Sequence, residues 1–197
     1  MMEVTSPLVR KIVDAVPDAY RRLVVHGDAP AVARELLQDV KPAQLLAQPI
    51  TSPTAADALL AALWLWHDAL DESHRISQRI ETPDGSYWHG IMHRREGDFS
   101  NSKYWLARCR NHPAGAAIAQ QLPAIIAGHS ANDPAVARLN ANGEWDPFAF
   151  VDLAEEVHDR PDDPRHGLTV AIQRLEWRAL FEFCARRATA TGGASRA

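Results

Sequence analysis

The sequence is poor in the features that mark secreted, membrane-bound or nucleic-acid-binding proteins. It has only two cysteines, Cys109 and Cys184, each among apolar residues at helical spacing, which favours buried free thiols in a reducing compartment. Its longest candidate for a membrane span, residues 58–66, is about half the ~18–20 apolar residues required. The N-terminus has an early acid and lacks the apolar segment of a secretory signal. We therefore expect a cytoplasmic protein with no membrane partner.

The sequence also has no large excess of charge of either sign, and it lacks the common catalytic motifs. The formal net charge is −4 and the pI about 6.1, so no general basic field favours nucleic acid as a partner. The chain has no P-loop, no dinucleotide glycine pattern, no Gly-x-Ser-x-Gly elbow and no Cys-x2-Cys pair. These absences exclude the usual nucleoside-triphosphate hydrolysis, Rossmann redox chemistry and serine-esterase chemistry.

Strand signals are nearly absent, whereas apolar residues recur at helical spacing along most of the 197 residues. A chain of this length forms about one domain. We predict an all-α single domain over residues 1–187, a bundle of about seven to nine helices, followed by a disordered tail at 188–197.

Several helices can be placed from their capping residues and apolar stripes. Ser52 followed by Pro53 starts a helix, and the pattern continues to about Ile80. Because residues 58–66 are apolar on every side, this is the expected long buried central helix. Similar patterns predict helices over residues 17–25 and 168–187.

The stretch from residue 59 to 113 concentrates the side chains that carry chemistry. It holds five of the nine histidines and four of the six tryptophans. Two strings in it have the same spacing, in which residues i, i+4 and i+7 fall within about 60° on one face of a helix. They are His67, Asp71, His74 and His89, His93, Glu96.

Imidazole and carboxylate are ligands for Zn, Fe and Mn, and helical bundles build metal sites from facing helices. A turn at residues 83–85 would fold the second triplet against the first. We expect a divalent metal ion, with either Asp71 or Glu96 as a further ligand or catalytic base. The expected metal-binding residues are His67, His74, His89 and His93. A metal-free polar pocket and a purely structural network remain open alternatives.

Seven side chains around the triplets are candidate contacts of a substrate. They are Trp64, Trp88, Arg94, Asp98, Asn101, Lys103 and Tyr104. Arg94 and Lys103 carry the positive charge that an anionic group would need, whereas Arg95 is expected on a solvated face. Asp98 fits equally well as a helix N-cap, whereas tryptophans are more often core residues than a platform for a substrate.

Residues 66–105 resemble a family of bacterial proteins with no assigned activity. The resemblance is specific over this stretch, supports the position of a site and implies no reaction. His67 and Asp68 also resemble the adjacent His-Asp pair of the HD-domain metal phosphohydrolases. The Gly-Lys segment that follows that pair in the family is replaced here by residues 69–71.

Two functions are compatible with these patterns. The first is a metal-dependent hydrolase acting on a small polar or anionic substrate, in which the metal activates water. The second is a non-catalytic module that binds a small-molecule ligand or forms a homodimer, in which the cluster is a structural polar network.

Overall fold

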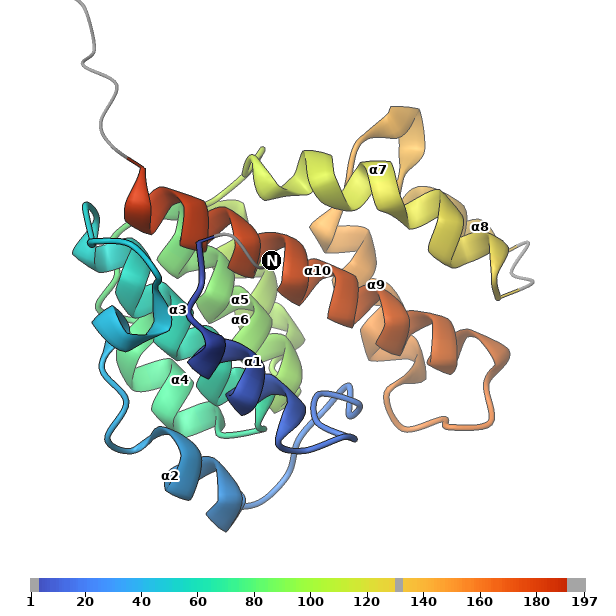
Figure 1. The fold of residues 1–197 in the computed structure, drawn as a ribbon. Coiled ribbons are helices and arrows are strands. Elements are labelled where there is room, and N and C mark those ends of the chain that lie inside the picture. Colours follow the sequence, from blue (N-terminus) through green and yellow to red (C-terminus); the bar gives the residue numbers. More distant parts are fainter. Residues whose placement is uncertain (1–3, 130–132, 191–197) are drawn as a thin grey trace, which may run out of the picture.

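The computed structural model describes residues 4–129 and 133–190, and this part of the chain is helical with no strand (Figure 1). The all-α prediction is confirmed, with ten α-helices and two short 3-10 helices in the described residues. The elements are α1 (Pro7–Asp14), α2 (Ala31–Leu37), η1 (Pro42–Leu45), α3 (Pro53–Trp66), α4 (Leu70–Ser77), α5 (Pro83–Glu96), α6 (Phe99–Ala107), α7 (Ala114–Ala127), α8 (Pro134–Arg138), η2 (Ala141–Gly143), α9 (Pro147–Val157) and α10 (Pro164–Thr189).

Helix α3 is the buried centre of the fold. Its sequence is apolar on nearly every side, and residues 61–66 are all buried. Helices α1, α2, α4, α5 and α10 all pack against it, which satisfies the apolar surface that such a helix must bury.

The central helix is shorter than predicted, because it ends at Trp66 instead of continuing to Ile80. Asp68 has a left-handed backbone (φ 61°), which breaks the helix before α4 begins. Aspartate tolerates this conformation better than most residues. Its carboxylate accepts hydrogen bonds from Arg22 (2.6 Å) and Arg95 (2.5 Å). Two tertiary ion pairs therefore hold the break in place.

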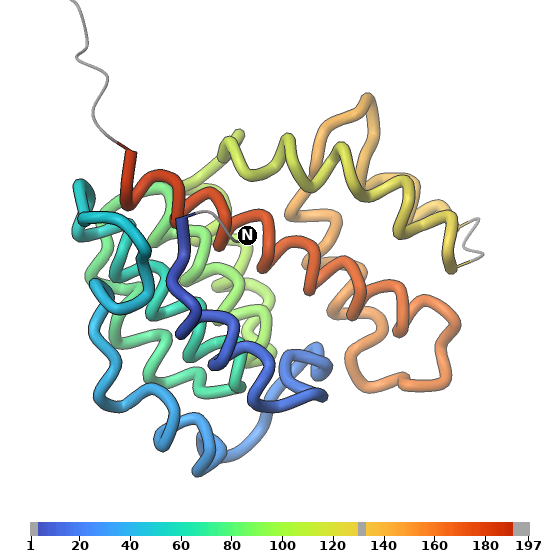
Figure 2. Tube along the Cα trace, in the orientation of Figure 1, coloured from blue at the N-terminus to red at the C-terminus, as the bar shows by residue number. Residues whose placement is uncertain are grey.

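Helix α10 joins two hydrophobic cores. Its C-terminal half lies in the larger core with α3, whereas its N-terminal half packs with α7 and α9 in a smaller one. Figure 2 shows α10, in red, running between these two groups of helices. The helix is longer than the predicted 168–187, so Ala188 is buried and helical and not part of a tail. Residues 191–197 of the predicted tail lie outside the described part.

The predicted helix over residues 17–25 is wrong, because this segment forms turns. Tyr20 is fully buried with a left-handed backbone (φ 60°). The carbonyl oxygen of Arg22 accepts hydrogen bonds from Arg95 (3.1 Å) and Gln173 (3.0 Å). Tertiary contacts thus take the place of helical hydrogen bonds in this segment.

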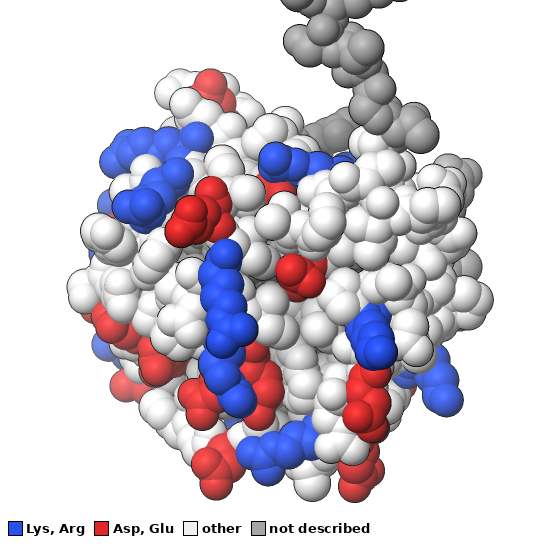
Figure 3. All heavy atoms as spheres, turned by 90° about the vertical axis from the view of Figure 1, so that its left-hand side faces the viewer, with Lys and Arg blue, Asp and Glu red and all other residues white. Residues whose placement is uncertain are grey.

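Figure 3 shows charged side chains of both signs mixed on the face that is turned to the left in Figure 1. None of the described helices is both long and apolar enough to cross a membrane.

Candidate metal centre

The connection between α4 and α5 brings the two histidine-bearing helices together. The Thr82 hydroxyl accepts a hydrogen bond from the Gly85 backbone N–H (3.4 Å) and caps α5. A Cβ atom at position 85 would lie 2.1 Å from the carbonyl oxygen of Ile80. Only glycine allows this approach, so α5 turns back tightly and packs against α4.

Three histidines meet where α4 faces α5. His74 comes from α4, and His89 and His93 come from adjacent turns of α5. Each offers one ring nitrogen, and these three atoms all lie within 4.8 Å of one another. The ring centroids are 4.7 Å apart for His74 and His89, 5.4 Å for His74 and His93, and 4.8 Å for His89 and His93. We refer to these three residues as the histidine triad.

His89 is the most deeply placed member of the triad. His89 is only 3% exposed, and neither of its ring nitrogens has a hydrogen-bond partner among the described residues. Burial, followed by the neighbouring His93 and His74, lowers the pKa of His89 to about 3. The ring is therefore neutral at physiological pH, which is the state that binds metal ions. Trp105 stacks on it at 3.9 Å between ring centroids.

His93 is oriented by two polar side chains. Its Nδ1 lies 3.0 Å from a carboxylate oxygen of Glu96, and its Nε2 lies 3.1 Å from the amide nitrogen of Asn101. When Nδ1–H donates to Glu96, Nε2 carries the lone pair, as in carboxylate–histidine–metal arrangements. An ion bound at Nε2 would displace the Asn101 amide from this nitrogen.

His74 is the member of the triad that is partly exposed. Burial and the nearby His93 lower its pKa, while the carboxylates of Glu96 and Asp71 act in the opposite direction. A partly exposed third ligand leaves one side of the triad accessible from solvent.

The spacing of the triad fits a metal ion after small side-chain rotations. Zinc–nitrogen bonds of about 2.0–2.1 Å in a tetrahedral site set the nitrogens roughly 3.4 Å apart. The observed limit of 4.8 Å therefore requires the rings to close in by about an ångström or somewhat more. Three histidines with a remaining open position form the ligand set of catalytic zinc sites.

His67 lies outside the triad, although its spacing predicted otherwise. Because α3 ends at Trp66, His67 caps that helix, and its Nε2 donates to the Ile12 carbonyl oxygen at 2.9 Å. The adjacent Asp68 is occupied by its two arginine partners. Through these contacts, His67 and Asp68 connect the end of α3 with α1 and with residues 17–25.

The two predicted catalytic carboxylates lie beside the triad. Glu96 contacts His93 directly, while Asp71 lies on the exposed side of α4, one turn before His74. Both line a cavity of ≈ 260 Å³ together with Asp28, Glu72 and other residues of the 25–34 segment. This cavity adjoins the triad through Glu96, which contacts His93.

The predicted cationic substrate contacts are engaged elsewhere. Arg94 forms a fully buried ion pair with Glu176 of α10. Lys103 pairs with Asp152 of α9 at 2.6 Å. Arg95, expected on a solvated face, is buried. From sequence alone, an arginine among other charged residues at the end of a helix is expected at the surface. The burial of these arginines is explained by carboxylates that are distant in the chain and pair with them in the fold.

Of the remaining predicted contacts, Asn101 reaches the His93 ring with its side chain, and Asp98 contacts His93 through its backbone N–H, which donates to the His93 carbonyl oxygen (2.9 Å). Asp98 is the N-cap of α6 and accepts a hydrogen bond from the Asn101 backbone N–H (3.1 Å). Tyr104 is 58% exposed, whereas Trp64 and Trp88 are buried in the larger core.

Trp105 and Gly90 shape the site but were not among the predicted site residues. A Cβ atom at Gly90 would lie 2.9 Å from the Leu106 side chain, so glycine lets α6 approach α5 closely. Asn101 and Trp105 are four residues apart and share a face of α6. That spacing is the signal in the sequence that could have placed Trp105 beside His89.

Comparison of the chain with protein-family models, curated proteins and solved structures gives no match. The bacterial family resemblance of residues 66–105 therefore stays a prediction.

Proposed function

We propose that the histidine triad binds one divalent transition-metal ion and that the protein is a metal-dependent hydrolase of a small polar substrate. The observation that carries this proposal is the state of His89. Leaving a buried polar atom without a hydrogen bond costs roughly 1–3 kcal/mol. A metal ion shared with His74 and His93 would satisfy one ring nitrogen of His89 and remove that part of the cost.

The number of protein ligands supports a hydrolytic function. A metal held by three histidines keeps a position for water and lowers the pKa of that water towards neutrality. Glu96 holds the His93 ring, and Asp71 stands at the rim of the adjacent cavity, where a carboxylate can accept a proton from the water.

The charge of the cavity favours a neutral or cationic substrate over an anionic one. Among the charged residues of the cavity walls, Arg34 pairs with Glu72 at 3.8 Å. Asp28, Asp71 and Glu96 add three further carboxylates to the same walls. An anionic substrate would be repelled here, and Arg94 and Lys103 are not free to attract it.

A structural network is the second candidate, favoured by the contacts that the triad makes with α6. Trp105 stacks on His89, and Asn101 contacts His93, so the cluster could serve only to pack α5 against α6. In that case the protein binds no ion stoichiometrically, and its histidines contribute to stability alone.

Zinc titration of the untagged protein separates the two candidates. After removal of metals with EDTA, isothermal titration calorimetry with Zn²⁺, and in parallel Mn²⁺ and Fe²⁺, should give one ion per chain. The His89→Ala/His93→Ala double variant should bind at least a hundredfold more weakly. The His129→Ala/His166→Ala variant, which removes two histidines outside the triad, should bind normally. Absence of stoichiometric metal, or equal binding by both double variants, would refute the metal site.

Hydrolysis needs its own test. The zinc-loaded protein should cleave 4-nitrophenyl acetate, a neutral ester, faster than 4-nitrophenyl phosphate, and the His89→Ala/His93→Ala variant should lose this activity. A protein that binds zinc yet hydrolyses neither probe faster than this variant would keep the metal site and overturn the hydrolase.

A further inference from the structure

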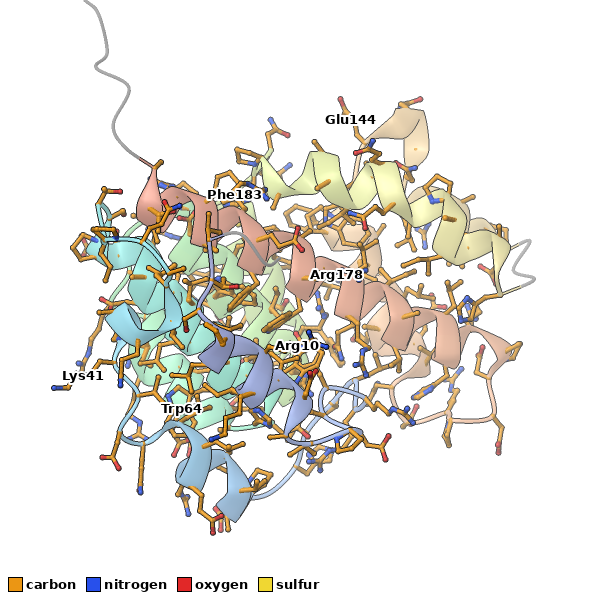
Figure 4. The ribbon with its side chains drawn as sticks, viewed as in Figure 1. Arg10, Lys41, Trp64, Glu144, Arg178 and Phe183 are labelled. Carbon is orange, nitrogen blue, oxygen red and sulfur yellow. The ribbon has the colours of Figure 1, made fainter. Side chains whose placement is uncertain are left out.

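A second cavity lies between the C-terminal end of α1 and the middle of α10, and it shares no residue with the triad or its neighbouring cavity. Its volume of ≈ 480 Å³ falls in the range of small-molecule sites. Figure 4 shows Arg178 on α10 near α1, from which Arg10 extends. The apolar walls come from Val13, Val16, Pro17, Ala171 and Leu175.

The floor of this cavity is aromatic and rigid. Trp66 and Trp177 both line it, with ring centroids 4.6 Å apart. Each indole N–H is already satisfied, by the carbonyl oxygen of Val13 (3.2 Å) and of Ala62 (2.9 Å) respectively. Tyr20 stacks on Trp66 at 5.2 Å. Trp66 and Trp177 are only 6% and 1% exposed, so the floor offers apolar ring edges and no free donor, which suits an apolar group.

Two guanidinium groups edge the cavity without a carboxylate partner. Arg174 lies over the Trp66 ring at 4.9 Å and donates to the Ala19 carbonyl oxygen at 3.2 Å. Within residues 4–129 and 133–190, neither Arg174 nor the exposed Arg178 forms an ion pair. Arg10, Arg21 and Arg22 each form one. Burial lowers the pKa of Arg174, and the positive charges of Arg21 and Arg178 lower it further.

Asp18 acts on Arg174 and opposes the lowering of its pKa, but the nearby acids form their ion pairs with other arginines. Asp14, on the cavity wall, lies 3.3 Å from Arg10, and Asp18 lies 3.1 Å from Arg21. Two like charges held together beside a low-dielectric wall are unfavourable unless an anion joins them. A ligand carrying one anionic group would supply that partner.

We propose that this cavity binds a small aromatic carboxylate. The ring lies against Trp66 and Trp177 between the apolar walls, and the carboxylate lies between Arg174 and Arg178, whose guanidinium groups can bind it in the bidentate manner. This site is independent of the proposed metal chemistry.

Calorimetric titration with matched probes tests the site on the intact protein. 2-Naphthoate should bind saturably, and 2-naphthamide, which has the same ring system without the charge, should bind at least tenfold more weakly. Arg178→Glu should weaken 2-naphthoate binding tenfold or more. Arg186→Glu makes the same charge change on an exposed turn of α10 outside the cavity, and it should leave the affinity within twofold.

A third variant tests the location without altering charge. Ala171→Leu adds side-chain volume at the cavity wall and should abolish 2-naphthoate binding while the thermal midpoint stays within a few degrees. Three results would overturn the proposal. They are no saturable binding of 2-naphthoate, equal binding of the amide, and equal losses in Arg178→Glu and Arg186→Glu.

Discussion

Arg94 and Glu176 form an ion pair in which both side chains are almost completely removed from solvent, 1% and 0% exposed. The pair fastens α10 to α5, the helix that carries two members of the triad. Arg94 also lies over the Phe150 ring at 4.4 Å, so this arginine connects three helices. The next residue, Arg95, donates to the Leu65 carbonyl oxygen at 2.6 Å. Consecutive arginines thus fix α5 from two sides and hold His89 and His93 in position.

Removing one partner of this pair should destabilise the fold severely. Glu176→Ala leaves the Arg94 charge buried without compensation, and we expect the free energy of unfolding to fall by about 3–5 kcal/mol. Urea denaturation followed by circular dichroism measures it. An Arg94→Met/Glu176→Leu double variant should recover part of the loss, since neither buried charge remains. A loss below about 1 kcal/mol in Glu176→Ala would show that water reaches the pair.

Gly90→Ala should loosen the packing of α6 on α5. The added methyl group would lie 2.9 Å from Leu106 and 3.3 Å from the Ser102 carbonyl oxygen, and such overpacking costs about 1–3 kcal/mol. The Ser102 hydroxyl, which donates to the Gly90 carbonyl oxygen at 2.8 Å, would be displaced. Thermal and urea denaturation report the loss.

The control for this substitution is Gly167→Ala in α10. A Cβ atom there meets nothing within 4 Å, so the higher helix propensity of alanine should stabilise the protein by up to about 1 kcal/mol. If Gly90→Ala and Gly167→Ala change the free energy of unfolding in the same direction, the close packing of α6 on α5 does not depend on glycine at position 90.

Glu96→Gln should weaken metal binding by the triad about tenfold to a hundredfold, the usual effect of removing the carboxylate that orients a metal-binding histidine. The amide cannot accept the Nδ1 proton of His93 with the strength of a carboxylate. Competition between the protein and a chromogenic chelator for Zn²⁺ measures the change. Glu81→Gln, an exposed substitution outside the 260 Å³ cavity, should bind as the wild type does. Equal affinity of both variants would mean that Glu96 does not support the ligand.

Stability should depend on pH through His67. Burial lowers the pKa of this histidine in the folded protein, whereas in the unfolded chain it is near 6.5. Below about pH 6.5 the unfolded state therefore binds a proton that the folded state does not. The free energy of unfolding should fall as the pH decreases through this range towards the lower folded pKa.

His67→Gln isolates this contribution, because a glutamine amide can still donate to the Ile12 carbonyl oxygen but does not titrate. The difference in free energy of unfolding between pH 7 and pH 5, from urea titrations in a metal-free buffer, should be smaller in the variant than in the wild type. An unchanged difference would assign the pH dependence to other groups.

The sequence by itself determined what depends on neighbours a few residues apart. Helical spacing placed His89 and His93 on one face of α5, and Asp133 and Asp146, each followed by a proline, cap the starts of α8 and α9. These features are visible because a helix is stabilised by contacts between residues i and i+4 and by side chains that cap its first turn.

Only the tertiary structure decided which of the histidines meet. Asp68 breaks the predicted long helix because Arg22 and Arg95 reach it from distant segments, and this break removes His67 from the face of His74. The burial of Arg94 likewise depends on Glu176, 82 residues further along the chain. Local periodicity carries no information on such pairs, because the free energy that pays for burying a charge comes from a partner that the fold brings near.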